Sequence, residues 1–345
     1  MMDILVKVQP SNIQFNAVEN ATILDSALTA GVILGHSCKN GSCGLCTSQL
    51  LSGEVISQEG EIFTSGQSFL TCQCKPSSNE IIIEADYYPE LAGIIRKVTP
   101  CKVSSIEKRA QFAIFKFRLP PAAELKYLPG QYINLSYQGV TRSYSIANSN
   151  SNSNSNSNSN SNSNSNSNSN SNDGIELHIR RVSDGVMSEL LFSDVSVNSL
   201  LRMDGPIGTF FVRPDTKPII FLAGGTGFAP VKAMVESLIA QESSRDILIY
   251  WGMNSSKDFY SDLPIEWASK FKNIKYIPVV SGDDHDWDGR HGLVHKAVIE
   301  DTQDMSNSCV YACGSPQMIA AAKQDFVHAG LLEKQFFSDA FTASK

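Results

Sequence analysis

Four cysteines in the first quarter of the chain have the spacing of a metal site. Cys38, Cys43 and Cys46 follow the pattern C-x4-C-x2-C, and Cys72 comes after 25 further residues. This spacing is typical of a two-iron, two-sulfur cluster held by four thiolates. Small and glycine residues separate the first three cysteines, so the loop can turn tightly and point backbone N–H groups at sulfur. Four thiolates also suit zinc, although zinc ribbons usually carry two C-x2-C pairs and this chain has one.

Two short motifs in the middle of the chain combine residues that suit flavin and phosphate. The string Arg142-Ser143-Tyr144-Ser145 reads as a strand, so its arginine and tyrosine face one side and its serines the other. Alone, this string indicates either a flavin site or an exposed strand. The string Gly185-Val186-Met187-Ser188 follows a strand predicted over 175–181 and opens a helix, whose N-terminal amides suit a pyrophosphate.

A glycine-rich turn follows an apolar stretch further along the chain. Residues 219–224 form a predicted strand, and Gly224-Gly225-Thr226-Gly227 then leads through Pro230 into a predicted helix. This order is typical of a dinucleotide site in a doubly wound α/β domain, although close helix packing also selects glycine. Cys313-Gly314 follows another predicted strand and should lie at the same carboxyl edge of the sheet, where ligands bind.

The elements that must position these motifs differ along the chain. In residues 1–90, a short helix is predicted over 22–31, capped by Thr22 or Asn20, with strands predicted over 4–8, 49–56 and 81–85. Residues 95–213 contain short strands separated by Pro-Pro and Pro-Gly, as in an antiparallel β-barrel. Residues 214–345 alternate strands and helices, as in an α/β domain with a doubly wound parallel sheet.

A perfect dipeptide repeat interrupts the barrel segment. Ser-Asn occurs twelve times over 149–172, without a charge or an apolar side chain. The remaining 321 residues have an ordinary globular composition, enough for two or three domains. We expect the tract to be a disordered, dispensable loop between two strands. The alternative is a non-catalytic interaction protein in which the tract is the working part.

Negative charge is concentrated at the N-terminal end. The formal net charge is −7, and the first 90 residues hold ten acidic side chains against three lysines, so the remainder is neutral. This distribution argues against nucleic acid or an anionic membrane as partner and favours a basic docking surface on another protein, although acidic surfaces also aid solubility.

No segment predicts secretion or membrane insertion. The first ten residues lack an apolar core, and the apolar stretch 218–231 is broken by glycines and shorter than the ~18 residues that a membrane helix needs. We expect a cytoplasmic monomer with no membrane partner. Its eight cysteines then indicate metal or redox chemistry rather than disulfides.

Together the motifs resemble the ferredoxin–NADP reductase superfamily, preceded by a plant-type ferredoxin domain. The resemblance is carried by the cysteine pattern with Phe69-Leu-Thr-Cys72, by Arg-x-Tyr-Ser, by Gly-Gly-Thr-Gly-x-x-Pro and by Cys-Gly-x-Pro. It implies a plant-type 2Fe-2S ferredoxin domain of the α+β (β-grasp) class over 1–90. It also implies an FAD-binding antiparallel β-barrel over 95–213, with the repeat loop 149–172 inserted, and an NAD-binding domain over 214–345.

The resemblance also assigns site residues. It implies that Ser145, Cys313 and Phe341 are catalytic and that the cluster ligands are Cys38, Cys43, Cys46 and Cys72, with Cys74 a spare buried thiol. The implied cofactor-binding residues are Arg142, Ser143, Tyr144, Ser145, Gly185, Val186, Met187, Ser188, Gly224, Gly225, Thr226, Gly227, Pro230, Cys313, Gly314 and Phe341.

Within this set, the implied roles differ. Arg142 and Ser188 would hold the FAD phosphates, Tyr144 would pack on the flavin, and Ser145 would lie near its N5. Cys313 would lie at the hydride-transfer position, and Phe341 would cover the flavin until nicotinamide displaces it. Many relatives have tyrosine at this last position.

Outside the repeat, the full length resembles the CDP-6-deoxy-Δ-3,4-glucoseen reductases of dideoxysugar biosynthesis. Tyr87-Tyr-Pro-Glu-Leu91, Val279-Val-Ser-Gly-Asp-Asp284 and Phe336-Phe-Ser-Asp-Ala-Phe341 carry this resemblance. It implies that electrons pass from NADH to FAD, to the 2Fe-2S cluster, and then to a pyridoxamine-phosphate-dependent sugar-nucleotide dehydrase. The same domain order occurs in reductases of phenol and benzoate oxygenases, so an oxygenase partner is the alternative.

Three further residue-level expectations follow. The segment 251–258 contains Lys257 but no arginine, which favours NADH over NADPH. Asp339 is expected to be a solvated loop acid rather than a group that tunes the flavin. His291 and His295 are four residues apart but are expected to lie in solvated surroundings rather than to bind metal.

Overall fold

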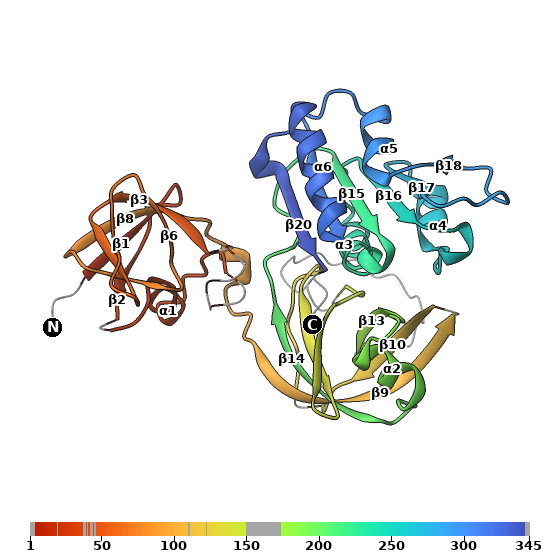
Figure 1. Ribbon diagram of the computed structural model, residues 1–345, viewed down its shortest axis with the longest axis horizontal. Helices are drawn as coiled ribbons and strands as arrows, with labels where there is room; N and C mark the ends of the chain where they lie inside the picture. Colours follow the sequence, from red (N-terminus) through yellow and green to blue (C-terminus); the bar gives the residue numbers. More distant parts are fainter. Residues whose placement is uncertain are drawn as a thin grey trace, which may run out of the picture. The chain divides into compact units, whose positions relative to one another are not determined.

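The computed structural model divides the chain into two compact units (Figure 1). The first comprises Met1–Ile95 and Ile207–Thr209, and the second Arg96–Pro206 and Phe210–Lys345. The structure describes residues 4–341 apart from 19, 37, 38, 40, 42, 43, 45, 110, 122 and 150–173. Cys38, Cys43 and all but the first residue of the Ser-Asn tract therefore lie outside the described residues.

The first unit has the β-grasp arrangement that the sequence predicts. Its five-stranded sheet has the order β2-β1-β8-β3-β6, in which β1 pairs antiparallel with β2 and parallel with β8. A second sheet has the order β5-β4-β7. The strands are β1 (Ile4–Gln9), β2 (Ile13–Ala17), β3 (Thr47–Ser52), β4 (Glu54–Ser57), β5 (Ile62–Thr64), β6 (Ser68–Leu70), β7 (Cys74–Pro76) and β8 (Glu80–Glu84).

The helix α1 (Ile23–Thr29) packs its apolar side on this sheet. Thr22, and not Asn20, caps it, because Thr22 Oγ1 accepts a hydrogen bond from the Asp25 amide (3.1 Å). Ile23, Leu24 and Ala27 are fully buried, as their spacing predicts.

One predicted strand of this unit is wrong. The expected strand over 49–56 is two strands, β3 and β4, which lie in different sheets. Gly53 separates them with φ +89°, and a Cβ at this position would lie 2.5 Å from the carbonyl oxygen of Glu80. The chain therefore turns at Gly53, because only glycine fits this conformation and this close approach.

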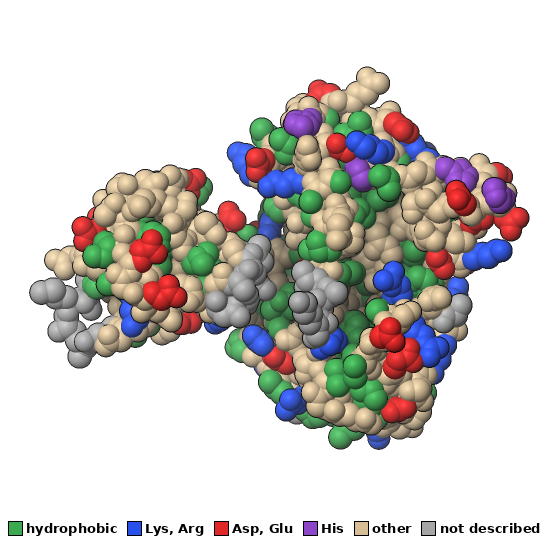
Figure 2. Space-filling view, viewed as in Figure 1, with side chains coloured by type: hydrophobic (Ala, Val, Ile, Leu, Met, Phe, Trp, Pro, Cys, Tyr) green, Lys and Arg blue, Asp and Glu red, His purple; other side chains and the backbone are tan. Residues whose placement is uncertain are grey.

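The surface of the first unit is acidic (Figure 2). On its visible face, acidic side chains outnumber basic ones. Lys7 is 3.0 Å from Glu80, and Lys39 is 3.9 Å from Asp25. The first 90 residues hold ten acidic side chains and only three lysines, so most of the carboxylates have no lysine to neutralise them.

The second unit contains an antiparallel β-barrel. The sheet order is β12-β11-β14-β9-β10-β13, and an isolated bridge between Ile146 and Leu177 joins its two edges. The core contains Val103, Phe115 and Leu135, and the helix α2 (Val186–Ser193) adds apolar side chains to it. The strands are β9 (Lys97–Arg109), β10 (Phe112–Arg118), β11 (Tyr132–Tyr137), β12 (Val140–Ser145), β13 (Ile175–Arg180) and β14 (Leu200–Ile207).

The second unit also contains a parallel sheet with helices on both faces. Its strand order is β18-β17-β16-β15-β19-β20, and all five pairings are parallel. The strands are β15 (Ile219–Gly224), β16 (Ile247–Met253), β17 (Ile274–Val280), β18 (Arg290–His291), β19 (Cys309–Gly314) and β20 (Phe336–Ala340). The order reverses between β15 and β19, which is the switch point where doubly wound sheets bind ligands.

Alternate side chains of the strands face opposite layers. Phe221 packs with α3 (Phe228–Ala240) and α4 (Leu263–Lys270), whereas Leu222 packs with α5 (Val294–Asp301) and α6 (Pro316–His328). The remaining elements are short 3-10 helices: η1 (Pro89–Leu91), η3 (Gly225–Gly227), η4 (Ser256–Asp258) and η5 (Glu333–Gln335). The β-grasp, barrel and doubly wound parts confirm the predicted fold classes. Among the described helices, none is both long and apolar enough to cross a bilayer.

Candidate cofactor sites

The glycine-rich turn and the Cys313-Gly314 turn meet at the switch point. Ala223 on β15 lies opposite Cys313 on β19. A Cβ at residue 227 would lie 2.1 Å from the carbonyl oxygen of Cys313, so only glycine permits this contact. The indole Nε1 of Trp251 donates to the carbonyl oxygen of Gly225 (2.9 Å) and fixes the turn from the neighbouring strand. The turn is therefore rigid and has bare backbone, as close approach to a pyrophosphate requires.

Three of the residues predicted to act near the flavin lie close to one another. Cys313 on β19 lies opposite Asp339 on β20, and Ser145 Oγ, at the end of β12, donates to Asp339 Oδ2 (3.5 Å). The amide of Phe341 donates to the carbonyl oxygen of Gly314 (2.9 Å), which extends the β19–β20 pairing by one residue. The structure thus brings Ser145, Cys313 and the start of the C-terminal segment together, while their catalytic roles stay predictions.

The expectation for Asp339 as a solvated loop acid is wrong. Asp339 lies within strand β20 and is half-buried. Burial raises the pKa of its carboxyl to about 6, and the hydrogen bond from Ser145 lowers it only partly. A carboxyl that titrates near neutral pH beside Ser145 can hold or release a proton there.

Cys313 and Phe341 differ in their access to a ligand. Cys313 has no exposed surface, and burial raises the pKa of its thiol well above the ordinary value. Phe341 is 36% exposed, so its ring is available for stacking. A direct contact between the Cys313 thiol and a coenzyme would require local movement of the neighbouring side chains.

The predicted flavin strand has the expected alternation of side chains. Arg142 and Tyr144 are half-buried, whereas Ser143 between them is exposed and donates to Asn134 Oδ1 (2.8 Å). Arg142 Nη1 donates to the carbonyl oxygen of Thr141 (2.8 Å). The other four guanidinium donors have no partner among the described residues, so they fit a phosphate.

The start of α2 fits a pyrophosphate through its backbone. Gly185 is the N-cap residue and offers no side chain to the first amides of the helix. The Ser188 hydroxyl is engaged locally: it accepts from the Val182 amide (3.1 Å) and lies 2.9 Å from the carbonyl oxygen of Gly185. Ser188 therefore stabilises the turn in this structure, and its predicted contact with FAD stays a prediction.

A buried charge network, which the motifs did not predict, joins the barrel to α3. Lys232 Nζ lies 3.1 Å from Glu176 Oε1 and 2.7 Å from Glu236 Oε1, and it donates to the carbonyl oxygen of Ala147 (3.1 Å). His178 Nε2 is 2.9 Å from Glu176 Oε1, and its Nδ1 is 3.0 Å from the Tyr260 hydroxyl. The only sequence signals were a lysine in an apolar helix and a histidine in an apolar strand.

The protonation states in this network follow from burial. Burial lowers the pKa of His178, so the ring is neutral and donates from Nε2 to Glu176. For Glu176, burial alone would raise the pKa, but the hydrogen bond from His178 and the charge of Lys232 lower it to about 2. Glu176 is thus ionised, and Lys232 is its buried counter-ion. Lys232 also binds the carbonyl oxygen of Ala147, which lies two residues beyond the end of the predicted flavin strand.

Two of the four predicted cluster ligands are described, and they face each other. Cys46 Sγ and Cys72 Sγ are buried and 3.1 Å apart without a disulfide. Gln73 Nε2 donates to Cys72 Sγ (3.3 Å) and to the carbonyl oxygen of Lys39 (3.2 Å), which links Cys72 to the cysteine loop. Two thiols converging on one point fit a shared metal centre, whereas Cys74 lies buried on β7.

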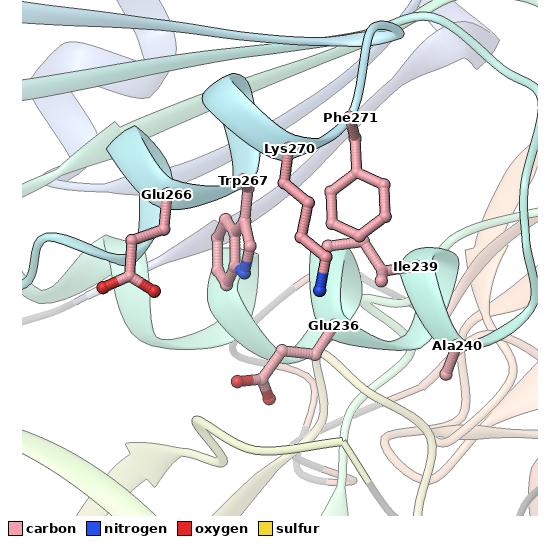
Figure 3. A pocket seen from close by; sticks show the side chains of 7 residues that line it. All are labelled: Glu236, Ile239, Ala240, Glu266, Trp267, Lys270 and Phe271. Atoms are coloured by element: carbon pink, nitrogen blue, oxygen red, sulfur yellow. The ribbon is translucent and has the colours of Figure 1, made fainter.

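A pocket elsewhere in the α/β part contains none of the predicted site residues (Figure 3). It measures about 280 Å³ and lies between α3 and α4, with Trp267 and Lys270 opposite Glu236 and Ile239. Glu236 lines this pocket and also belongs to the buried charge network, because its Oε1 contacts Lys232. Its Oε2 accepts a hydrogen bond from the Ser149 amide (3.2 Å).

Comparison with known families identifies three cofactor domains. Residues 6–77 match the family model of the 2Fe-2S iron-sulfur cluster binding domain. Residues 100–158 and 155–212 match the oxidoreductase FAD-binding domain, and residues 221–324 match the oxidoreductase NAD-binding domain. These matches confirm the predicted cofactors, a 2Fe-2S cluster, FAD and NADH, and favour the cluster over zinc.

The chain has relatives that it matches over nearly its full length. The chain is 51% identical to protein RfbI of Salmonella typhimurium, covering 99% of this chain and 98% of that protein. It is 48% identical to CDP-6-deoxy-L-threo-D-glycero-4-hexulose-3-dehydrase reductase of Yersinia pestis, covering 100% of both chains. A reductase component of terephthalate 1,2-dioxygenase from Comamonas is more distant, at 31% identity over 98% of this chain and 97% of that protein.

Solved structures with a similar fold cover nearly the whole chain. The Amycolatopsis cytochrome P450 reductase GcoB has a TM-score of 0.72 at 25% identity, covering 99% of each chain. A ferredoxin reductase of carbazole 1,9a-dioxygenase has a TM-score of 0.66 at 25% identity, covering 98% of each chain.

Proposed function

Because this chain belongs to the family of iron–sulfur flavoprotein reductases that includes RfbI and the CDP-6-deoxy-L-threo-D-glycero-4-hexulose-3-dehydrase reductases, we propose that its electron acceptor is a sugar-nucleotide dehydrase. The chain is an oxidoreductase that carries electrons from NADH through FAD and a 2Fe-2S cluster to a partner protein. The proposed activity is of the CDP-4-dehydro-6-deoxyglucose reductase type. The full-length identity to dehydrase reductases, against 31% to an oxygenase reductase, is the observation that carries this proposal.

The division of work between cofactors explains the three domains. When bound, FAD would supply the exchange between the two-electron chemistry of the nicotinamide and the one-electron chemistry of an iron–sulfur cluster. The protein's own task is to orient the two ring systems and to keep water away from them. Ser145 and Asp339 lie where β12 meets β20, and their hydrogen bond can hold a proton between Ser145 Oγ and Asp339 Oδ2.

Binding of the two dinucleotides relies on different parts of the second unit. Arg142 and the first amides of α2 are proposed to hold the FAD phosphates, and the bare turn 224–227 the coenzyme pyrophosphate. Tyr144 is half-buried on the same side of β12 as Arg142, where its ring can pack on a flavin.

The cluster domain is the proposed exit for electrons. Cys46 and Cys72 are proposed as two of the four ligands, with Cys38 and Cys43 as the others. The excess negative charge of this domain favours an acceptor with a basic docking face, which speeds encounter at low salt.

A reconstituted assay tests the choice of acceptor. The purified reductase is incubated anaerobically with NADH, a CDP-6-deoxy-hexulose and its pyridoxamine-phosphate-dependent dehydrase, and NADH consumption is followed together with the deoxygenated sugar product. We expect NADH consumption that requires both the dehydrase and the sugar nucleotide and weakens as salt rises. If NADH oxidation is coupled instead to the terminal component of an aromatic-ring oxygenase, and not to the dehydrase, the proposed acceptor is wrong.

A further inference from the structure

The turn after β16 lies where a doubly wound sheet places the adenosine ribose of its coenzyme. This ribose carries the one difference between NADH and NADPH, a 2′-hydroxyl or a 2′-phosphate. A 2′-phosphate site needs hydrogen-bond donors and a cation, most often a bidentate arginine. The turn offers Lys257, but Lys257 Nζ is 3.5 Å from Asp286 Oδ2 and both side chains are 79% exposed, so it is a weak, solvated pair.

The neighbouring loop reaches this turn from the next strand. β16 and β17 are parallel partners, with Met253 opposite Val280, so their following loops leave the same edge side by side. The Gly282 amide donates to the carbonyl oxygen of Asn254 (3.0 Å). A Cβ at residue 282 would lie 2.4 Å from that oxygen, so glycine at this position lets the loops touch.

Asp284 in this second loop binds the donors of the first. Its Oδ2 accepts from Ser255 Oγ (2.8 Å) and from the Ser256 amide (2.7 Å), and its Oδ1 accepts from the Asp286 amide (3.2 Å). These hydrogen bonds, above all that from the Ser256 amide, hold the pKa of Asp284 well below its usual range. The carboxylate therefore stays charged throughout the physiological pH range.

We propose that Asp284 is the residue that makes this enzyme select NADH over NADPH. Its carboxylate occupies the hydroxyl and the amide that a 2′-phosphate would need, and its negative charge repels that phosphate. Oδ1 has lone pairs left for a free 2′-hydroxyl, which can donate to a carboxylate as in other doubly wound folds. This inference rests on the proposed function, because it assumes that a nicotinamide dinucleotide binds at the edge of the α/β sheet.

The other charges near the turn strengthen the repulsion. Asp283, Asp286 and Asp288 lie in the same loop. Arg290, just beyond it, is bound by Glu300 and Asp301, so its charge is already neutralised. In the two loops, residues 254–258 and 281–290, Lys257 is the one lysine or arginine besides Arg290.

The test compares two neighbouring carboxylates. Asp284→Asn keeps the side-chain shape and an acceptor oxygen but removes the charge. Asp283→Asn removes the same charge from the adjacent, exposed position and is the matched control. Asp284→Ser, which frees both donors, is the second variant in case Asp284→Asn fails to fold. Dissociation constants for NAD⁺ and NADP⁺ are measured by calorimetry on the oxidised holoenzyme, with flavin content as the check on folding.

We expect Asp284→Asn to tighten NADP⁺ binding roughly tenfold and to change NAD⁺ binding by less than about threefold. Asp284→Ser should shift the ratio in the same direction, and Asp283→Asn should change either constant by no more than about twofold. An unchanged NADP⁺/NAD⁺ ratio in both Asp284 variants, or an equal shift in Asp283→Asn, would overturn the inference while the proposed function stands. A wild-type enzyme that binds neither coenzyme would instead overturn the proposed function, and this inference with it.

Discussion

Replacing Lys232 with methionine would break the buried charge network between the barrel and α3. Methionine keeps the length of the side chain but removes the ammonium that lies between Glu176 and Glu236. The Glu176 side chain is only 11% exposed, so its carboxylate cannot turn to water. The carbonyl oxygen of Ala147 would lose its donor at the same time.

The magnitude follows from the pKa of Glu176. Burial raises this pKa, and the hydrogen bond from His178 and the charge of Lys232 bring it from 4.5 to about 2. A depressed carboxyl pKa stabilises the folded state above pH 4.5, and this stability is lost as the pH falls through about 2. A shift of this size corresponds to roughly 3 kcal/mol at neutral pH, and removing one partner of a buried pair costs about 3–5 kcal/mol.

We therefore expect Lys232→Met to lower the stability of the second unit by roughly 3 kcal/mol at pH 7, or its Tm by about 6–12 °C. Thermal unfolding followed by tryptophan fluorescence measures this, because Trp251 is fully buried in the unit. The loss should shrink in acid, where Glu176 is protonated in the variant.

The chain supplies a matched control. Lys116 Nζ lies 3.5 Å from the other oxygen of Glu176, but the Lys116 side chain is 57% exposed. Lys116→Met should cost less than about 1 kcal/mol. Adding Glu176→Leu to Lys232→Met should restore part of the loss, because it removes the uncompensated charge. If Lys232→Met is no more destabilising than Lys116→Met, the assignment of a buried counter-ion is refuted.

Three further predictions concern the cluster, the C-terminal strand and the repeat. Cys72→Ser should abolish the visible cluster signal while NADH–ferricyanide activity persists, and Cys74→Ser should change neither; the opposite pattern would reverse the ligand assignment. Burial raises the pKa of Asp339 from 3.8 to about 6, so the folded state favours the protonated carboxyl. The stability that this carboxyl contributes is fully present below pH 3.8 and is lost as the pH rises through about 6. Asp339→Asn should therefore be roughly 2 kcal/mol more stable than the wild type at pH 8, and a Tm that does not rise there would disprove the assigned burial. Replacing residues 149–172 with Gly-Asn-Gly should leave flavin content and turnover unchanged, and a large loss of either would show that the tract has a function.

The features that could be predicted from sequence are those carried by contiguous residues. The turn 224–227 and the strand 142–145 each hold their chemistry within a few positions, and the structure places the turn at the switch point of the parallel sheet and the strand at an edge of the barrel sheet. Continuous apolar runs also predicted central strands of the parallel sheet, such as β15, because strands buried on both faces carry apolar residues at successive positions.

The features that could not be predicted depend on partners far apart in the chain. Lys232 and Glu176 are brought together by packing of α3 on the barrel, and an isolated lysine in an apolar helix does not reveal its counter-ion. Asp339 looked like a loop acid because β20 forms only by parallel pairing with β19. Asp284 reaches the turn after β16 from a different strand, so a search of residues 251–258 could not find it.

An anaerobic titration of the purified protein with NADH, followed by visible absorption, tests whether electrons pass from NADH through FAD to the cluster. We expect the bands of an oxidised flavin together with those of a 2Fe-2S cluster, and bleaching of both as NADH is added. A protein that lacks either set of bands, or whose bands NADH does not bleach, would contradict it.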